Sequence, residues 1–136
     1  MDEKKIYVEI ITPQAALFSG NADAVTVPGA KSPFQVLYNH AAIVSALEPG
    51  IVIIKNDEQV SYFASDSGLA EVRDNKVSIL VEAALLGSGV DISKLNAERE
   101  ALSKDYKTET IEANKEKISN KIKYIDVKIK AKSYYS

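Results

Sequence analysis

All six glycines and all four prolines of this 136-residue chain lie within residues 1–89. Glycine and proline mark turns and weaken helix interiors, so this part of the chain consists of short segments separated by turns. From Asp91 onward both residue types are missing from the sequence, and lysine, glutamate and alanine become frequent. The change at Gly87-Ser88-Gly89 predicts an α+β chain, with a β domain in residues 1–89 and a helical part in residues 90–136.

The segments before residue 90 have the pattern of short strands. Apolar residues occupy every second position, for example Ile6, Val8 and Ile10. Turn residues recur every 8–12 positions or so, among them Thr12-Pro13 and the hairpin-type pair Asp74-Asn75. This spacing predicts an all-β sandwich or barrel rather than β-α-β units.

The helical part divides into two amphipathic stretches. Asp91 or Ser93 can cap the first helix, and Thr108 or Thr110 can cap the second. The second stretch repeats isoleucine at a mean spacing of about 3.5 residues, which is typical of a helix that packs along another helix. The apolar stripes are Ile92, Leu95, Leu102 and Tyr106 in the first helix and Ile111, Ile118, Ile122, Ile125 and Ile129 in the second. We expect an antiparallel helical hairpin, which either docks on the β domain or detaches from it, because short helices depend on tertiary packing.

Charge is distributed unevenly along the chain. Residues 1–90 carry six basic and eleven acidic residues, whereas residues 91–136 carry eleven basic and eight acidic residues. A basic helical arm on an acidic domain indicates an acidic partner surface. The alternative is an ordinary solvated helical face.

Several classes of function lack the residues that they need. The sequence has no cysteine and a single histidine, His40, which argues against thiol catalysis and against zinc or iron sites built from histidines. We interpret His40 as a loop imidazole bonded to the backbone. No glycine-rich phosphate loop, transmembrane run or signal peptide is found in the sequence. Tyr124, Tyr134 and Tyr135 could stack on bases, but the net charge of −2 argues against nucleic-acid binding.

Residues 25–50 contain the most distinctive sequence motifs of the chain. Pro28-Gly29 is followed by Asn39-His40-Ala41 and then by Pro49-Gly50. With Leu17-Phe18-Ser19-Gly20 before them and Tyr62-Phe63 after them, these spaced motifs resemble the epsilon subunit of the F-type ATP synthase. The resemblance covers nearly the full length of the chain.

That resemblance implies an N-terminal antiparallel β-sandwich followed by a C-terminal antiparallel two-helix hairpin. It implies a non-catalytic subunit of the rotating central stalk, docked by its sandwich on the gamma subunit and the c-subunit ring. Residues 1–89 would then serve docking, and residues 90–136 would form a regulatory arm. The residues expected to face the ring and stalk are Lys31, Ser32, Pro33, Phe34, Asn39, His40, Ala41, Ala42, Ile43 and Val44.

The family also implies a role for the helices, which can extend into the catalytic head and restrain ATP hydrolysis. The basic residues expected to approach acidic residues of the alpha and beta subunits are Lys115, Lys121, Lys123, Lys128 and Lys130. Some relatives bind ATP through an Asp-x-x-Arg motif, which here becomes Asp91 and Lys94. Lysine lacks the planar fork of arginine, so we expect weak or absent ATP binding and no other cofactor or metal.

Some positions carry residues that differ from those usual in this family. Gln35 stands where glycine is usual, and Tyr38 and Ala42 stand where proline is usual. If the usual glycine has a backbone that only glycine adopts readily, Gln35 requires a reshaped loop.

Two further expectations concern where the protein is held and which other function the sequence allows. We expect a peripheral protein held by its complex at the cytoplasmic face of a bacterial inner membrane, or at the stromal face of plastid thylakoids. The alternative is a stand-alone β-sandwich adaptor whose basic hairpin binds an acidic protein or nucleic acid.

Overall fold

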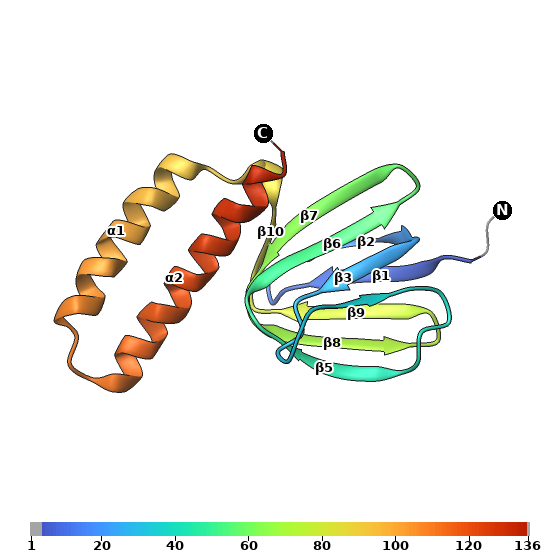
Figure 1. Ribbon diagram of the computed structural model, residues 1–136, viewed down its shortest axis with the longest axis horizontal. Helices are drawn as coiled ribbons and strands as arrows, with labels where there is room; N and C mark the ends of the chain where they lie inside the picture. Colours follow the sequence, from blue (N-terminus) through green and yellow to red (C-terminus); the bar gives the residue numbers. More distant parts are fainter. Residues whose placement is uncertain (1–3, 136) are drawn as a thin grey trace.

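A computed structural model describes residues 4–135, which form a β-sandwich followed by two antiparallel helices (Figure 1). One five-stranded sheet has the order β2-β1-β9-β8-β5, and the other has the order β10-β7-β6-β3-β4. The predicted α+β class is therefore confirmed. The strands are β1 (Ile6–Ile11), β2 (Ala16–Ala22), β3 (Ala24–Val27), β4 (Phe34–Val36), β5 (Ile43–Leu47), β6 (Gly50–Asn56), β7 (Gln59–Ser65), β8 (Gly68–Arg73), β9 (Lys76–Val81) and β10 (Ala84–Leu86).

Alternation along the strands builds the sandwich core. Ile6, Val8 and Ile10 of β1 are fully buried, and they pack in one apolar cluster with residues such as Val25 and Ile79. The predicted turn at Asp74-Asn75 is confirmed, because both residues have positive φ, at 50° and 61°. Two such residues form the tight turn that suits the twist of a hairpin.

One strand pair departs from the antiparallel arrangement. β1 and β9 pair in parallel, with Val8 opposite Val77 and Ile10 opposite Ile79. The other paired strands of residues 4–135 run antiparallel. β9 returns from the β8–β9 turn in the direction of β1, so this long-range pair closes the middle of the sheet.

The helices are α1 (Ile92–Thr108) and α2 (Glu112–Ser133), preceded by a short 3-10 turn, η1 (Gly87–Gly89). Asp91 caps α1 as predicted, since its carboxylate accepts a hydrogen bond from the backbone N–H of Lys94 at 3.2 Å. The predicted cap of α2 at Thr108 or Thr110 is wrong. Ile111 holds the N-cap position, and its N–H donates to the carboxylate of Glu109 instead.

The hairpin has a small core of its own. Val90, Leu95 and Ile125 are buried together, and Ile92, Leu102 and Ile129 pack around them. Ile111 does not belong to the buried seam, since 59% of its surface is exposed, whereas Ile125 is 2% exposed. Arg99 of α1 and Asp126 of α2 add an ion pair of 2.7 Å across the two helices.

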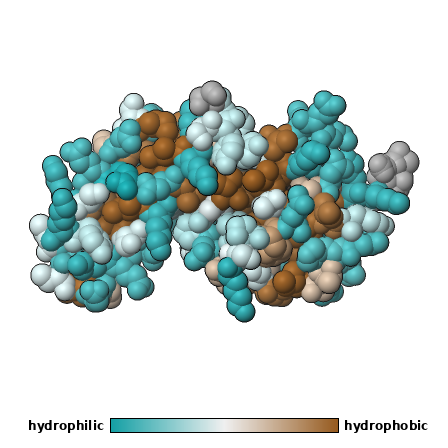
Figure 2. All heavy atoms as spheres, viewed as in Figure 1, coloured by the Kyte–Doolittle hydropathy of each residue, from teal (hydrophilic) through white to brown (hydrophobic). Residues whose placement is uncertain are grey.

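The hairpin docks on the sandwich mainly through α2, which packs against β7, β6 and η1 (Figure 1). Ala64 of β7 is fully buried without belonging to the sandwich core, because it lies on the outer face that α2 covers. Figure 2 shows hydrophobic residues along this junction and between the helices, with hydrophilic residues on the outer flanks of the hairpin. Within residues 4–135, no helix is long and apolar enough to cross a membrane.

Candidate interaction surfaces

The first candidate surface lies where β4 and β5, the edge strands of the two sheets, follow one another in the chain. We call residues 34–44 the β4–β5 edge. Four large apolar side chains are exposed along it: Leu37, Tyr38, Ile43 and Val44, of which Val44 is 63% exposed. Large apolar groups gathered at one exposed edge are typical of a protein-binding surface.

The loop within this edge has a defined shape. Asn39 has φ of 66°, and its N–H donates to the side-chain oxygen of Asn75 at 2.6 Å. His40 Nδ1 donates to the carbonyl of Ala41 at 2.7 Å, which confirms the interpretation of His40 as a backbone-bonded loop residue. Its ring lies 6.2 Å from that of Phe34. Hydrogen bonds to the backbone and to the neighbouring turn thus fix how this loop presents its apolar groups.

Only some of the residues predicted to face the ring and stalk lie close to one another. Phe34 and His40 are in contact, but Asn39 lies against the β8–β9 turn, at the end of the sandwich away from the helices (Figure 1). Lys31, Ser32 and Pro33 are exposed at the other end of β4, next to α2. Their proposed contacts with a ring or stalk stay a prediction.

The residues that differ from the usual family sequence fit the observed strand and loop. Gln35 pairs with Thr26 in a regular antiparallel register and is not among the positive-φ residues of the described chain. No glycine-only backbone is therefore needed at this position. Tyr38 and Ala42 are exposed in the loop, where their side chains meet no steric restriction from the core.

A second apolar surface, which sequence reasoning missed, crosses the outer face of the β5-containing sheet. Ala46, Leu69 and Leu80 lie opposite one another on β5, β8 and β9. Leu69 and Leu80 are exposed on about two fifths of their surface, at 39% and 42%. Alternation could have revealed them, because both leucines occupy positions opposite in phase to the buried Ala70 and Ile79.

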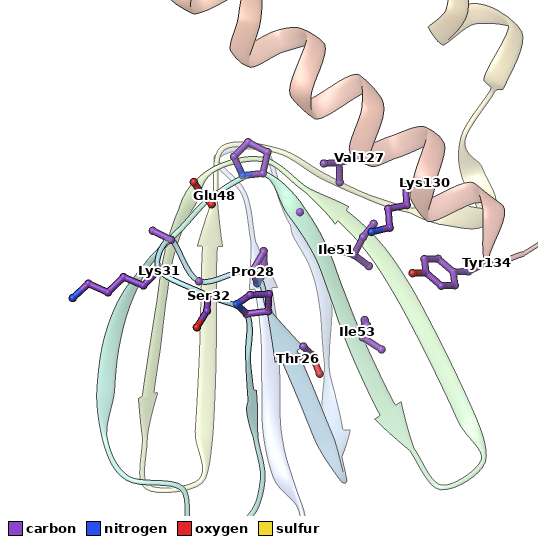
Figure 3. Close-up of a pocket in the computed structure, with 15 residues that line it drawn as sticks. Thr26, Pro28, Lys31, Ser32, Glu48, Ile51, Ile53, Val127, Lys130 and Tyr134 are labelled. Carbon is purple, nitrogen blue, oxygen red and sulfur yellow. The ribbon is translucent and has the colours of Figure 1, made fainter.

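The cavity between α2 and the sandwich, of about 470 Å³, joins the two sets of predicted residues (Figure 3). Val127 and Lys130 of α2, with Tyr134 just after the helix, face Ile51 and Ile53 of β6 across it. Lys31 lies at the rim, and its side chain points away from Lys130 in Figure 3. The docked helix therefore lies beside the turn between β3 and β4.

The predicted basic residues of α2 do not form one face. Lys121 and Lys128 are seven residues apart and share one side of the helix, while Lys123 and Lys130 lie two positions further on, about 200° around it. Lys115 and Lys128 are engaged within the hairpin, with their Nζ atoms 4.8 and 4.6 Å from the ring centres of Tyr106 and Tyr124. Lys121 and Lys123 are exposed.

Tyr124 borders a cavity of about 310 Å³ that also contains Asp66, Glu98 and Lys121. Burial, together with the charge of Asp66, raises the pKa of Tyr124 to about 12. The phenol therefore stays neutral over the physiological range. Its role is to pack between hairpin and sandwich.

The possible nucleotide residues lie at the start of α1. The Asp91 carboxylate already accepts the Lys94 N–H as a helix cap. Asp91 and Lys94 border a cavity of about 550 Å³ together with Glu98 and Lys128. The carboxylates of Asp91 and Glu98 would repel phosphate groups there. Among the described residues, no group of three or more metal-binding side chains is assembled.

Tyr134 and Tyr135, considered above as base-stacking residues, instead pack on the sandwich. The ring of Tyr134 stacks on Tyr62 with 4.1 Å between centres. A tyrosine following the last turn of α2 is thus joined to β7. No periodicity in the sequence indicated this contact.

Comparisons with known proteins agree with this architecture. Residues 5–87 match the family described as ATP synthase, Delta/Epsilon chain, beta-sandwich domain. The ATP synthase epsilon chain of Leptospira borgpetersenii is 36% identical over 99 residues, covering 73% of this chain and 76% of that protein. The epsilon chain of Campylobacter lari is 37% identical over 110 residues, covering 78% of this chain and 85% of that protein.

Solved structures share the fold at lower identity. A chain of the Euglena gracilis mitochondrial ATP synthase superposes with a TM-score of 0.79 at 19% identity, covering 93% of this chain and 80% of that chain. A chain from the central stalk and c-ring of the Tetrahymena thermophila enzyme gives a TM-score of 0.62 at 18% identity, covering 96% and 98%. The likeness extends over the helical hairpin as well as the sandwich.

Proposed function

Because this chain belongs to the family of ATP synthase epsilon chains, we propose that it is a non-catalytic subunit of the central stalk. In this role it transmits rotation of an ion-driven c-subunit ring to the catalytic head during ATP synthesis. The observation that carries the proposal is the family match over the sandwich and beyond. Family membership favours this role over a stand-alone adaptor.

The sandwich supplies the docking surfaces in this proposal. The β4–β5 edge presents Leu37, Ile43 and Val44, and Leu69 and Leu80 add apolar area on the adjoining sheet. Apolar groups exposed in the free subunit are well suited to burial against the gamma subunit and the ring. The protein would be held at the cytoplasmic face of a bacterial inner membrane, or at the stromal face of thylakoids, through these contacts alone.

The hairpin supplies regulation. Its small core, which is separate from the sandwich core, suits an arm that changes position. Exposed lysines such as Lys121 and Lys123 would meet acidic surfaces of the alpha and beta subunits, and charge would set approach and register. In the extended arrangement the hairpin would restrain ATP hydrolysis.

ATP hydrolysis by a reconstituted catalytic head with gamma tests the proposal. The full-length chain should bind and slow hydrolysis, whereas a truncation after Gly89 should bind without slowing it. Within the full chain, K121Q/K123Q should weaken restraint, and the matched control K104Q/K107Q on α1 should leave it unchanged. Failure of both full-length and truncated chains to bind gamma would refute the stalk role.

Weak or absent ATP binding is the remaining part of the proposal. Capping by Asp91 and the presence of Glu98 support it. A ligand that binds only the native state stabilises it by RT ln(1 + L/Kd), where L is the free ligand concentration, so the melting temperature rises with ligand concentration. Millimolar ATP should therefore leave the melting temperature of the isolated chain unchanged, and a clear rise would contradict this part.

A further inference from the structure

The end of α2 makes a specific contact with the sandwich edge. Tyr134, which follows the last helical residue, stacks face to face on Tyr62 of β7, with 4.1 Å between ring centres and 3° between planes. Tyr135 approaches the same ring edge-on, with centres 6.0 Å apart. Aromatic pairs of this geometry contribute beyond the area that they bury.

Tyr135 also replaces a missing strand residue. β10 ends at Leu86, opposite Phe63, one residue short of Tyr62. The backbone N–H of Tyr62 donates to the hydroxyl oxygen of Tyr135 at 2.8 Å. A phenol from the chain terminus thus takes the acceptor position that the next residue of β10 would otherwise occupy.

Gly87 allows this approach. A Cβ atom at position 87 would lie 2.5 Å from the carbonyl oxygen of Ala131 and 2.9 Å from the ring of Tyr135. No glycine within residues 4–135 has positive φ, so the backbone itself does not require glycine here. The requirement is for space. Lys132 Nζ adds a hydrogen bond to the carbonyl of Ser88 at 3.3 Å.

The rest of the hairpin depends less on the sandwich. The hairpin core around Leu95 and Ile125 is separate from the sandwich core, and α1 lies on the far side of α2 (Figure 1). If the end of α2 is released, the two helices can therefore leave the sandwich as a pair. We propose that Tyr62, Gly87, Tyr134 and Tyr135 form a C-terminal clasp that keeps the hairpin docked. Its regulatory meaning rests on the proposed function of the hairpin.

Glycine-to-alanine substitutions provide a matched test. G87A places a methyl group against Ala131 and Tyr135, whereas G89A meets only Leu85 at an ordinary 3.8 Å. Both residues lie in η1, so the two variants share their loss of backbone freedom. Y135F removes only the hydroxyl group, and Y106F on α1 is its control. All four variants are made in the full-length chain.

Two measurements report the position of the hairpin. Hydrogen exchange measures how strongly the backbone amides of Tyr62 and of β6 are protected. Since the sequence has no cysteine, T110C/E58C places one spin label on the helical loop and one on the β6–β7 turn. We expect Y135F to speed exchange of the Tyr62 amide about 2- to 10-fold, the range for one lost hydrogen bond. G87A should in addition lengthen the distance between the two spin labels and speed amide exchange in β6. G89A and Y106F should change neither the label distance nor the exchange.

Unchanged exchange and label distance in both G87A and Y135F would overturn the clasp. An equal effect of G89A and G87A would also overturn it, because the contact at Gly87 would then not matter. The hydrolysis assay separates the clasp from the function. If G87A opens the hairpin and hydrolysis stays the same, the clasp stands and the proposed restraint fails.

Discussion

Replacing Ile125 by alanine should open the helical hairpin and leave the sandwich folded. Ile125 is 2% exposed and lies at the centre of the hairpin core with Val90 and Leu95. The substitution removes three buried carbon atoms, at about 0.8 kcal/mol each. Half-buried neighbours such as Leu102 can relax into the space, so the total should stay near the lower end for such changes, about 2–3 kcal/mol.

That loss should appear in the hairpin alone. It corresponds to an increase of about 30- to 140-fold in the opening of α1 and α2. Hydrogen exchange measured by mass spectrometry on the full-length chain would record faster exchange in peptides of both helices. Peptides of β9 should exchange as in the wild type, because Val77 and Ile79 belong to the separate sandwich core.

Ile111 provides the control for this prediction. It is the same residue type in the same sequence stripe, yet it is 59% exposed. Ile111→Ala should change stability by less than about 0.5 kcal/mol. If I111A were as damaging as I125A, or if I125A also exposed β9, the separation into two cores would be refuted.

Other predictions concern charged and titrating groups. Burial raises the pKa of Tyr124 to about 12. Its contribution to the free energy of unfolding is therefore present below the unfolded pKa and is lost as pH rises toward 12. In urea melts at high pH, the stability of Y124F should fall less steeply with pH than that of the wild type. The hydrogen bond from Lys5 and the Asp57 N–H lower the pKa of Asp23, so its contribution is present above the unfolded pKa and is lost as pH falls through the lowered value. D23N should therefore flatten the loss of stability measured in acid. R99A should cost about 0.2–1 kcal/mol in low salt and less in high salt, because the Arg99 ion pair is half-exposed.

Local signals in the sequence determined the class of the fold. Turn residues before residue 90 and the change of period after Gly89 predict a sandwich followed by helices. The alternation of Ile6, Val8 and Ile10, the Asp91 cap and the Asp74-Asn75 turn depend on neighbours only a few residues away. Such signals can be recognised in the sequence itself, since propensity, capping and turn geometry are set over one turn of chain.

The candidate surfaces could be predicted less completely. Phe34 and residues 39–44 of the β4–β5 edge were predicted from the family resemblance, and their roles stay predictions, whereas the exposed Leu37 and Tyr38 emerged only with the structure. Alternation indicates that Leu69 and Leu80 point outward, but only the strand order shows that they lie side by side in one apolar row. The basic residues of α2 could be counted in the sequence, but their division between two sides and their contacts with Tyr106 and Tyr124 emerged only with the packed hairpin.

Long-range packing was decided by the tertiary structure alone. The parallel pairing of β1 with β9 joins residues about half the chain apart, and the Tyr62–Tyr135 hydrogen bond spans 73 positions. Ile111 and Ile125 look alike in the isoleucine stripe, yet only Ile125 meets the opposing helix core. The physical reason is that burial depends on the surface brought against a side chain, and that surface exists only after the chain has folded.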